Sequence, residues 1–173
     1  MDIQKVVPTD LDTVASLVSE VSKIDIFPLL NAQGRKEFSE RVIPDLCLAF
    51  NDENFLAIKA VSGGRLLGFA ALRDGNYLTH LFISKEAQGA GLGRELLNRL
   101  LSSTKASEIS LRSAVNSVSF YSHHGFVTTG DEAEFNGIRF VPMSLVRTHL
   151  AHEGPCEASV EKEVASLKGL QAG

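Results

Sequence analysis

The spacing of hydrophobic residues along the chain predicts an alternation of strands and helices. Short apolar runs with a period of two, bounded by turn-forming residues, predict β-strands. Apolar residues spaced three and four apart predict helices. The expected strands are 3–7, 55–61, 66–72, 77–83, 108–112, 126–129 and 138–145, and the expected helices begin near Thr9, near Arg35, at Leu92 and at Asn116. This order predicts an α+β domain with a mixed sheet.

The three central strands are joined by tight turns and therefore predict an antiparallel meander. Ser62-Gly63-Gly64-Arg65 and Asp74-Gly75 are the turns. Residues 24–34 lack a regular period because Pro28 interrupts their apolar positions, and the acidic segment 130–137 is interpreted as a loop. The composition shifts near Thr148, so we expect a domain over 1–147 and a helical tail over 148–173.

Composition and charge restrict the class of protein. With 44% hydrophobic residues and a net charge of −4, the chain is typical of a soluble globular protein and has no basic patch for nucleic acid. The N-terminus carries charges where a signal peptide needs apolar residues, and no apolar run approaches the roughly 20 residues of a membrane helix. Two cysteines favour a reducing compartment, so we expect a cytoplasmic protein that does not act at a membrane. His149 and His152 lack a third ligand at suitable spacing, and no metal site is expected.

The most informative stretch is Gln88-Gly-Ala-Gly-Leu-Gly-Arg94, between a strand and a helix. A helix N-terminus offers free N–H groups and a partial positive charge, and glycine lets a phosphate approach the backbone. The stretch lacks the Lys-Ser/Thr of a Walker loop. It also follows an antiparallel meander, whereas a dinucleotide fingerprint follows the first strand of a parallel unit. The alternative is a flexible turn without a ligand.

Three segments together resemble a known family. Gln88 to Gly93 is similar to the acyl-CoA loop of the GNAT superfamily of N-acetyltransferases, Phe120-Tyr-Ser-His-His-Gly-Phe126 resembles its F-Y-x-x-x-G-F segment, and Asn136 to Met143 resembles an ending found in a bacterial subgroup. The resemblance covers residues 1–147. It implies a mostly antiparallel, twisted sheet of about six or seven strands flanked by about four helices, with acetyl-CoA as co-substrate and no metal.

The resemblance also implies which residues bind the cofactor. The backbone around Leu81, Phe82 and Ile83 is expected to splay from its neighbouring strand and to offer N–H groups to the pantetheine and the thioester carbonyl. The loop residues implied are Gln88, Gly89, Ala90, Gly91, Leu92, Gly93 and Arg94. The family's cofactor-binding asparagine falls on Ala114 here, so Asn116, two residues later, is the candidate, with Ser117 or Ser119 as replacements.

Tyr121 is the candidate general acid for the leaving thiolate. Unperturbed pKa values of about 10 for tyrosine and 8.5 for a thiol make this transfer uphill by about 2 kcal/mol, and water is the alternative donor. His80 is the candidate base, although strict alternation places it on the opposite face from Tyr77 and Thr79 unless the strand has a bulge. A structural His80 with a water chain as base is the other interpretation. His123 and His124 are interpreted as charges at a helix C-terminus.

The sequence therefore predicts an N-acetyltransferase in which a small-molecule or peptide amine attacks acetyl-CoA directly in a ternary complex. No cysteine lies near either motif, so a covalent acyl-enzyme has no evident nucleophile. A non-catalytic acyl-CoA sensor is the rival prediction. Acidic residues in two loops (Asp25, Asp131, Glu132 and Glu134) are typical either of a site for a cationic amine or of solvated loops. A monomer and a homodimer remain equally open.

Overall fold

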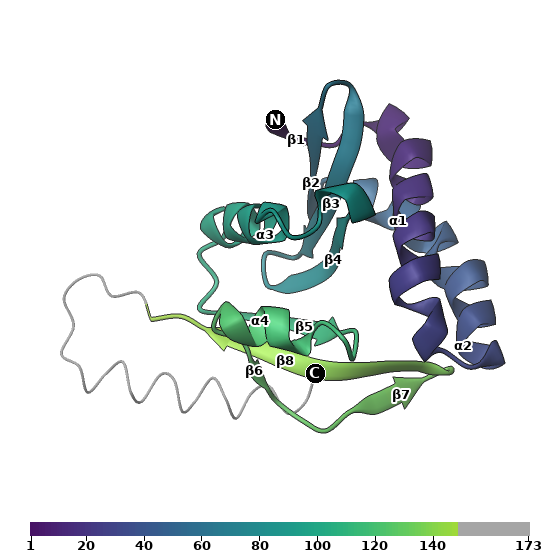
Figure 1. The fold of residues 1–173 in the computed structure, drawn as a ribbon. Coiled ribbons are helices and arrows are strands. Elements are labelled where there is room, and N and C mark those ends of the chain that lie inside the picture. Colours follow the sequence, from purple (N-terminus) through teal and green to yellow (C-terminus); the bar gives the residue numbers. More distant parts are fainter. Residues whose placement is uncertain (149–173) are drawn as a thin grey trace.

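The computed structural model describes residues 1–148, and the rest of the predicted tail lies outside the described residues. The chain folds into one mixed sheet with helices on both faces (Figure 1). The strands are β1 (Asp2–Lys5), β2 (Phe55–Ser62), β3 (Arg65–Arg73), β4 (Tyr77–Ile83), β5 (Glu108–Ser113), β6 (Val127–Thr128), β7 (Ala133–Phe135) and β8 (Ile138–Val146). The helices are α1 (Leu11–Asp25), α2 (Ala32–Glu37), α3 (Leu92–Ser102) and α4 (Val118–His123).

The sheet is antiparallel except at its centre. Its order is β1-β2-β3-β4-β5-β8-β6, with β7 paired to β8, and only β4 and β5 run parallel. The meander β2–β3–β4 is confirmed, with β4 over the predicted residues 77–83. Figure 1 shows α1 and α3 on opposite sides of the β1–β4 half, and α4 lying along β5 and β8.

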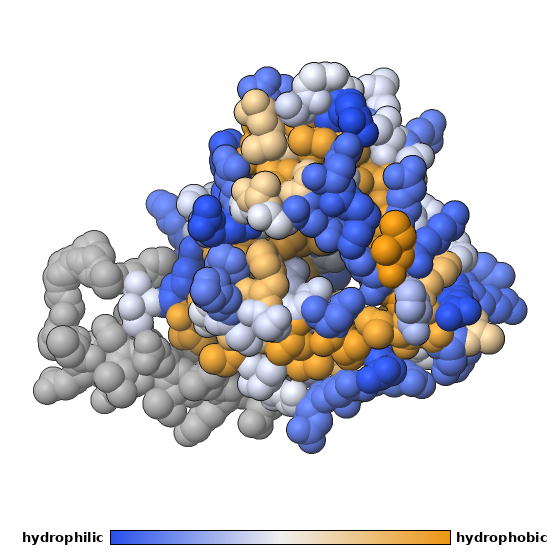
Figure 2. All heavy atoms as spheres, in the orientation of Figure 1, coloured by the Kyte–Doolittle hydropathy of each residue, from blue (hydrophilic) through white to orange (hydrophobic). Residues whose placement is uncertain are grey.

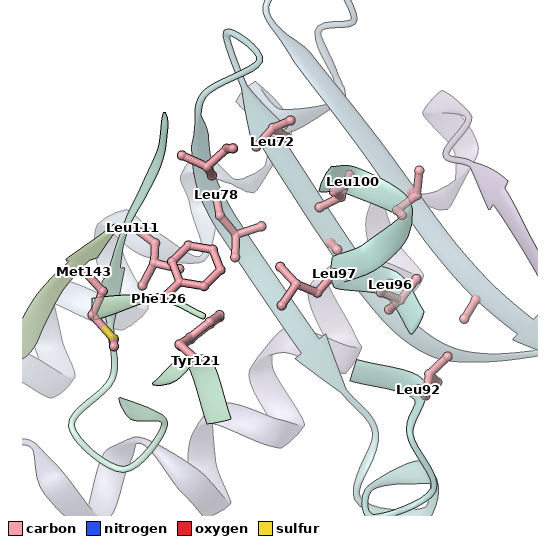
Figure 3. Close-up of a cluster of buried hydrophobic side chains, with 14 residues drawn as sticks. Leu72, Leu78, Leu92, Leu96, Leu97, Leu100, Leu111, Tyr121, Phe126 and Met143 are labelled. Atoms are coloured by element: carbon pink, nitrogen blue, oxygen red, sulfur yellow. The ribbon is translucent and has the colours of Figure 1, made fainter. Parts of the chain in front are cut away.

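Each face of the sheet has its own core. The stripe of α3 (Leu92, Leu96, Leu97 and Leu100) is buried against β-strand residues, and Figure 3 shows these side chains pointing toward the sheet. On the other face, Val14, Leu17, Val18 and Val21 of α1 pack with Phe69 and Ala71 of β3. The helical period predicted from the sequence selects these residues because i, i+3 and i+4 positions share one side of a helix.

The pairing between β4 and β5 is short. Only Tyr77 and Leu78 of β4 pair with β5, opposite Ser110 and Leu111. From His80 to Ile83, β4 pairs with β3 alone. Thus the sheet parts at its centre, and the β4 backbone beyond Leu78 loses its β5 partner.

One local prediction was wrong. Part of the acidic segment is strand β7, which forms a hairpin with β8 through Asn136 and Gly137, both at positive φ (52° and 82°). An Asn-Gly pair at positive φ is the preferred two-residue hairpin turn, so the polar composition concealed a strand. The first helix starts near Thr9 as predicted: the Val7 N–H donates to Asp10 Oδ2 at 2.8 Å, and a 3-10 turn, Pro8–Asp10, leads directly into α1 at Leu11.

The region after α1 is more helical than expected. A 3-10 turn, Phe27–Leu29, leads into α2, which begins at Ala32 because the Asn31 side chain accepts from the Gly34 N–H. A π-helical segment, Phe38–Val42, and a 3-10 segment, Pro44–Phe50, follow. Pro44 interrupts the helix as predicted, because proline cannot donate the interior backbone hydrogen bond.

Candidate active site

The parting of β4 from β5 opens into a cavity of about 700 Å³. A second cavity of about 380 Å³ lies at the N-terminus of α3, and both are lined by Ile83, Gln88, Gly93 and Phe120. The two cavities therefore adjoin, and together they are called the cleft. In Figure 2 the molecule is hollowed near its centre, between a mostly hydrophilic upper part and a more hydrophobic band below.

The unpaired edge of β4 supplies backbone donors to this cleft. The Ser84 N–H donates to the Leu67 carbonyl on β3 at 2.8 Å. Amide directions alternate along a strand, so the Phe82 N–H also faces β3 while the Leu81 and Ile83 N–H groups face the gap. The Ile83 carbonyl follows the same direction, because it accepts from Gln88 Nε2 at 3.0 Å. Of the three predicted backbone residues, Leu81 and Ile83 therefore offer donors to a ligand.

The glycine loop ends at a helix N-terminus that lacks a side-chain cap. Gly91 is the N-cap of α3 at φ 90°, a left-handed conformation that favours glycine. The Glu95 N–H makes the first helical bond to the Gly91 carbonyl, so the amides of Leu92, Gly93 and Arg94 precede the helical ladder. The Leu92 side chain is buried in the core and only its backbone is available. Ala90 is exposed and lines neither cavity.

The three glycines differ in what an added side chain would meet. A Cβ at Gly89 would meet nothing within 4 Å, so its positive φ is the constraint there. A Cβ at Gly91 would lie 3.3 Å from Arg94 Nη2, inside the smaller cavity. A Cβ at Gly93 would lie 3.4 Å from the Phe120 ring, an ordinary contact distance, so packing and backbone conformation do not by themselves require glycine there.

Basic side chains gather around the smaller cavity. Arg94 lines it together with His123 and His124 from the end of α4. Burial lowers the pKa of His124, and the charges of His123 and Arg94 lower it further. Mutual repulsion of this kind is relieved by an anion. From the sequence these histidines were assigned only to a helix end, and no local signal brings that end beside α3.

Tyr121 lies at the base of the cleft between the two halves of the sheet. Figure 3 shows it near Leu78 of β4, Leu111 of β5 and Phe126, and its ring packs edge-on against Phe126 with centroids 5.6 Å apart. Its side chain is 9% exposed and lines the larger cavity, and its hydroxyl has no hydrogen-bond partner within residues 1–148. Burial raises the pKa of Tyr121 well above its usual range, so the hydroxyl is protonated at neutral pH.

A β-bulge changes the face on which His80 lies. The register moves from Ala71↔His80 to Leu72↔Leu78, which leaves Thr79 as the extra residue. His80 therefore shares the α1 face with Tyr77, contrary to the prediction from strict alternation. Its ring lies 5.6 Å from the Phe69 ring and lines the larger cavity.

The His80 ring is hydrogen-bonded to its neighbour Thr79. Thr79 Oγ1 lies 2.8 Å from His80 Nδ1 and donates to the Ala71 carbonyl at 3.2 Å. In the tautomer that keeps both contacts, Nδ1–H donates to Thr79 and Nε2 carries the lone pair. Burial lowers the pKa of His80 to about 4. A neutral ring at pH 7 is a hydrogen-bond acceptor in the cavity.

Asn116 is held by the end of α1. Its side-chain amide donates to the Asp25 carbonyl at 2.9 Å, and the Asp25 carboxylate accepts from Lys85 Nζ at 2.8 Å and from Gln88 Nε2 at 3.3 Å. These contacts join the two sides of the cleft. Asn116 and Ser117 line the larger cavity, whereas Ser119 is exposed and lines neither cavity.

The rest of the larger cavity is lined by charged and apolar residues. The irregular segment contributes Asp25 and Ile26, and most of the remaining cover comes from 37–45 and from β8. Asp131, Glu132 and Glu134 do not line the cavity, and Glu132 is paired with Arg139 at 2.7 Å. Cys47, on the 3-10 segment, is exposed outside it.

Within residues 1–148, no group of three or more metal-ligating side chains occurs. No helix of this part of the chain is both long and apolar enough to cross a membrane.

A mixed sheet that parts beside a glycine-capped helix N-terminus is the arrangement that the sequence resemblance implies for an acyl-CoA site. The family model described as acetyltransferase (GNAT) domain matches residues 26–147, and the chain belongs to this family. No curated protein sequence matches the chain.

Solved structures show the same fold. The chain is similar to a GCN5-related N-acetyltransferase from Rhodopseudomonas palustris, with a TM-score of 0.68, 16% identity, and coverage of 84% of this chain and 94% of that one. For the PaiA N-acetyltransferase from Thermoplasma acidophilum, in complex with coenzyme A, the TM-score is 0.65 and the identity 18%, with coverage of 84% of this chain and 98% of that one. For the apo-form of YjaB from Escherichia coli, the TM-score is 0.67 and the identity 22%, with coverage of 85% of this chain and 98% of that one.

Proposed function

We propose that this protein transfers an acetyl group from acetyl-CoA to an amine by direct attack in a ternary complex. The observation that carries the proposal is that the two cavities adjoin and share lining residues. The uncapped amides at the start of α3 lie at the smaller cavity, while the unpaired stretch of β4 and Tyr121 line the larger one. A phosphate-bearing thioester needs both kinds of donor in one groove.

The residues of the smaller cavity fit a diphosphate. The backbone amides of Gly91 to Arg94 and the guanidinium of Arg94 supply donors and positive charge, and an anion would offset the repulsion that lowers the pKa of His124. The pantetheine arm would then pass Ile83 and Phe120, which line both cavities, into the larger one.

Backbone donors on β4 polarise the thioester. The Leu81 N–H faces the gap and would stabilise the negative charge that develops on the carbonyl oxygen. One such donor is worth about 3 kcal/mol of barrier in other enzymes. Because the donor belongs to the backbone, the strand holds it in position whatever side chain stands at residue 81.

Tyr121 would donate its proton to the leaving thiolate. Its raised pKa increases the cost of that transfer above the roughly 2 kcal/mol of the unperturbed groups. The same burial disfavours a thiolate and raises the pKa of the leaving thiol, so the two effects oppose each other. A protonated, unpartnered hydroxyl at the base of the cleft is suited to this role.

His80 is a poor base for a free ammonium. Its pKa of about 4 lies some six units below that of an alkylamine, a transfer cost of about 8 kcal/mol. We assign to Nε2 the role of accepting a hydrogen bond from the neutral amine and directing its lone pair. The amine loses its proton to water before it binds.

The test uses the two tyrosines of the chain as a matched pair. Release of the coenzyme A thiol is measured with saturating acetyl-CoA and a panel of amines, and coenzyme A affinity is measured by calorimetry. Tyr121→Phe should lower kcat by about 100-fold or more and leave the affinity within twofold, because only the proton donor is lost. Tyr77→Phe is the control, since Tyr77 is half-buried but lines neither cavity.

A loss of less than threefold in Tyr121→Phe would remove this residue from the mechanism. Coenzyme A binding without turnover on every amine would instead support the acyl-CoA sensor, which the absence of a carboxylate along β4 favours.

A further inference from the structure

We call the part of the larger cavity that lies beyond the glycine loop the acceptor side. Some of the charged side chains there form ion pairs and others do not. Three guanidinium groups line this cavity, from Arg41 in the π-helical segment, Arg112 in β5 and Arg139 in β8. Arg41 is paired with Glu37 at 3.6 Å and Arg139 with Glu132 at 2.7 Å. Arg112 forms no ion pair with any of residues 1–148. Its charge is the one left over for a ligand.

Arg112 is nevertheless held in position. Its guanidinium carbon lies 4.5 Å from the centre of the Phe140 ring, over the ring face. Stacking occupies one face of the guanidinium plane, while its N–H donors lie in the plane and remain available. A planar fork of donors fixed on an aromatic ring matches the two oxygens of a carboxylate.

The strand register puts Arg112 on the same face of the sheet as His80. Leu78 and Leu111 pair across the strands and both belong to the core under α3. Side chains alternate along β5, so Arg112 faces the α1 side. The bulge at Thr79 places His80 on that side too, and the two residues stand on opposite walls of the parting.

The electric field of Arg112 extends to β4. Burial raises the pKa of Tyr77, and the charges of Arg112 and Arg73 lower it in part. Three acidic groups also line the cavity, of which Asp25 is paired with Lys85 and Glu37 with Arg41. Asp45 alone has no ion pair within the described part of the chain, and it lies on the outer 3-10 segment rather than on a wall of the parting.

The rest of the acceptor side is apolar. Phe38, Phe135, Ile138 and Phe140 line it, and they leave room for a hydrocarbon group between the charged residues. We propose that the acceptor is a small amine that also carries a carboxylate and an apolar body, and that Arg112 binds the carboxylate. This inference rests on the proposed acetyl transfer, and it names the acceptor class of that same site.

The experiment compares acceptors that share one apolar body and differ in the anionic group, with kcat/KM referred to the concentration of neutral amine because this group also changes the amine pKa. Phenylalanine, leucine and methionine are each assayed against the corresponding carboxamide and decarboxylated amine, by thiol release at saturating acetyl-CoA. We expect kcat/KM to be tenfold or more higher for the carboxylates. Arg112→Gln should reduce this preference to near one, and Arg112→Lys should restore part of it because a charge returns without the planar fork.

Arg73→Gln is the control variant. Arg73 is stacked on Tyr77 at 4.7 Å in the adjoining part of the sheet, but it lines neither cavity. It should keep the full carboxylate preference. Asp45→Asn tests whether the acceptor is instead cationic. A cationic acceptor would lose affinity in Asp45→Asn and gain affinity in Arg112→Gln.

A binding measurement separates this inference from the proposed activity. Calorimetry with N-acetylphenylalanine and its carboxamide, on the chain saturated with coenzyme A, tests the carboxylate site without turnover. Arg112-dependent preference for the acid supports the inference even if no amine is acetylated, an outcome that would refute only the enzyme proposal. Equal binding of acid and amide, no binding of either, or an equal loss for both in Arg112→Gln would overturn it.

Discussion

Substituting Gly91 by alanine tests the anion site at its most constrained position. Gly91 caps α3 at φ 90°, and an added Cβ would lie 3.3 Å from Arg94 Nη2, with both residues lining the smaller cavity. The neighbouring atom ends a flexible side chain and can move aside. The substitution therefore has two separable effects, backbone strain in the free protein and an obstacle between the helix amides and a phosphate.

Their magnitudes follow from general values. An alanine held in the left-handed region costs about 1–2 kcal/mol of stability. Hydrogen bonds to a charged group contribute about 1.5–3 kcal/mol each. If the methyl group keeps the diphosphate from one or two of the α3 amides, the loss is about 3 kcal/mol, which corresponds to a roughly 100-fold rise in the Kd of coenzyme A.

The control is Gly64→Ala in the β2–β3 turn, where φ is 77° and a Cβ would meet nothing within 4 Å. Both variants should lose similar stability in urea unfolding, but only Gly91→Ala should lose affinity in calorimetry with coenzyme A. If the Kd of Gly91→Ala stays within twofold of the parent while its stability falls, the diphosphate does not bind at the α3 amides.

Two further predictions concern stability. The folded pKa of His80, about 4, lies below its unfolded value of about 6.5, so between these pH values only the unfolded chain binds this proton. The free energy of unfolding should fall by up to about 3 kcal/mol as pH drops from 6.5 to 4. Urea titrations of His80→Gln should lack this part of the dependence of unfolding free energy on pH. An identical dependence in His80→Gln would show that His80 is protonated in the fold. Gly34→Ala would place a Cβ against the Gly137 carbonyl, inside contact distance, and should cost about 1–3 kcal/mol of stability in urea unfolding. If the variant instead gains stability, as alanine usually does over glycine in a helix, α2 does not dock on the β7–β8 turn.

Part of the site was predictable because its signals are local. Gly89 and Gly91 stand between a strand and a helix, and both adopt positive φ. Tyr121 was identified through the resemblance of its segment to a family motif, and the cavity lining includes it. Ser119 instead lies on the exposed side of α4, because one position along a helix decides whether a side chain faces the cleft or solvent.

Other parts of the site were not predictable. The bulge at Thr79 depends on the register of β4 against β3, and no residue type in β4 predicts it. The histidines at the end of α4 meet Arg94 only because α3 and α4 lie on the same side of the parted sheet. Arg112 was not a candidate at all, since an arginine on a strand is ordinary until its surroundings are known.

The sequence alone determined the kinds of elements and their order, the tight turns and the helix N-terminus that meets an anion. Hydrophobic period and glycine conformation are properties of neighbouring residues, so they can be read along the chain. Tertiary structure decided where β4 leaves β5, which face His80 occupies and which charge remains unpaired at the acceptor side. These depend on contacts between segments far apart in sequence, because the energy of a strand pair or an ion pair belongs to both partners.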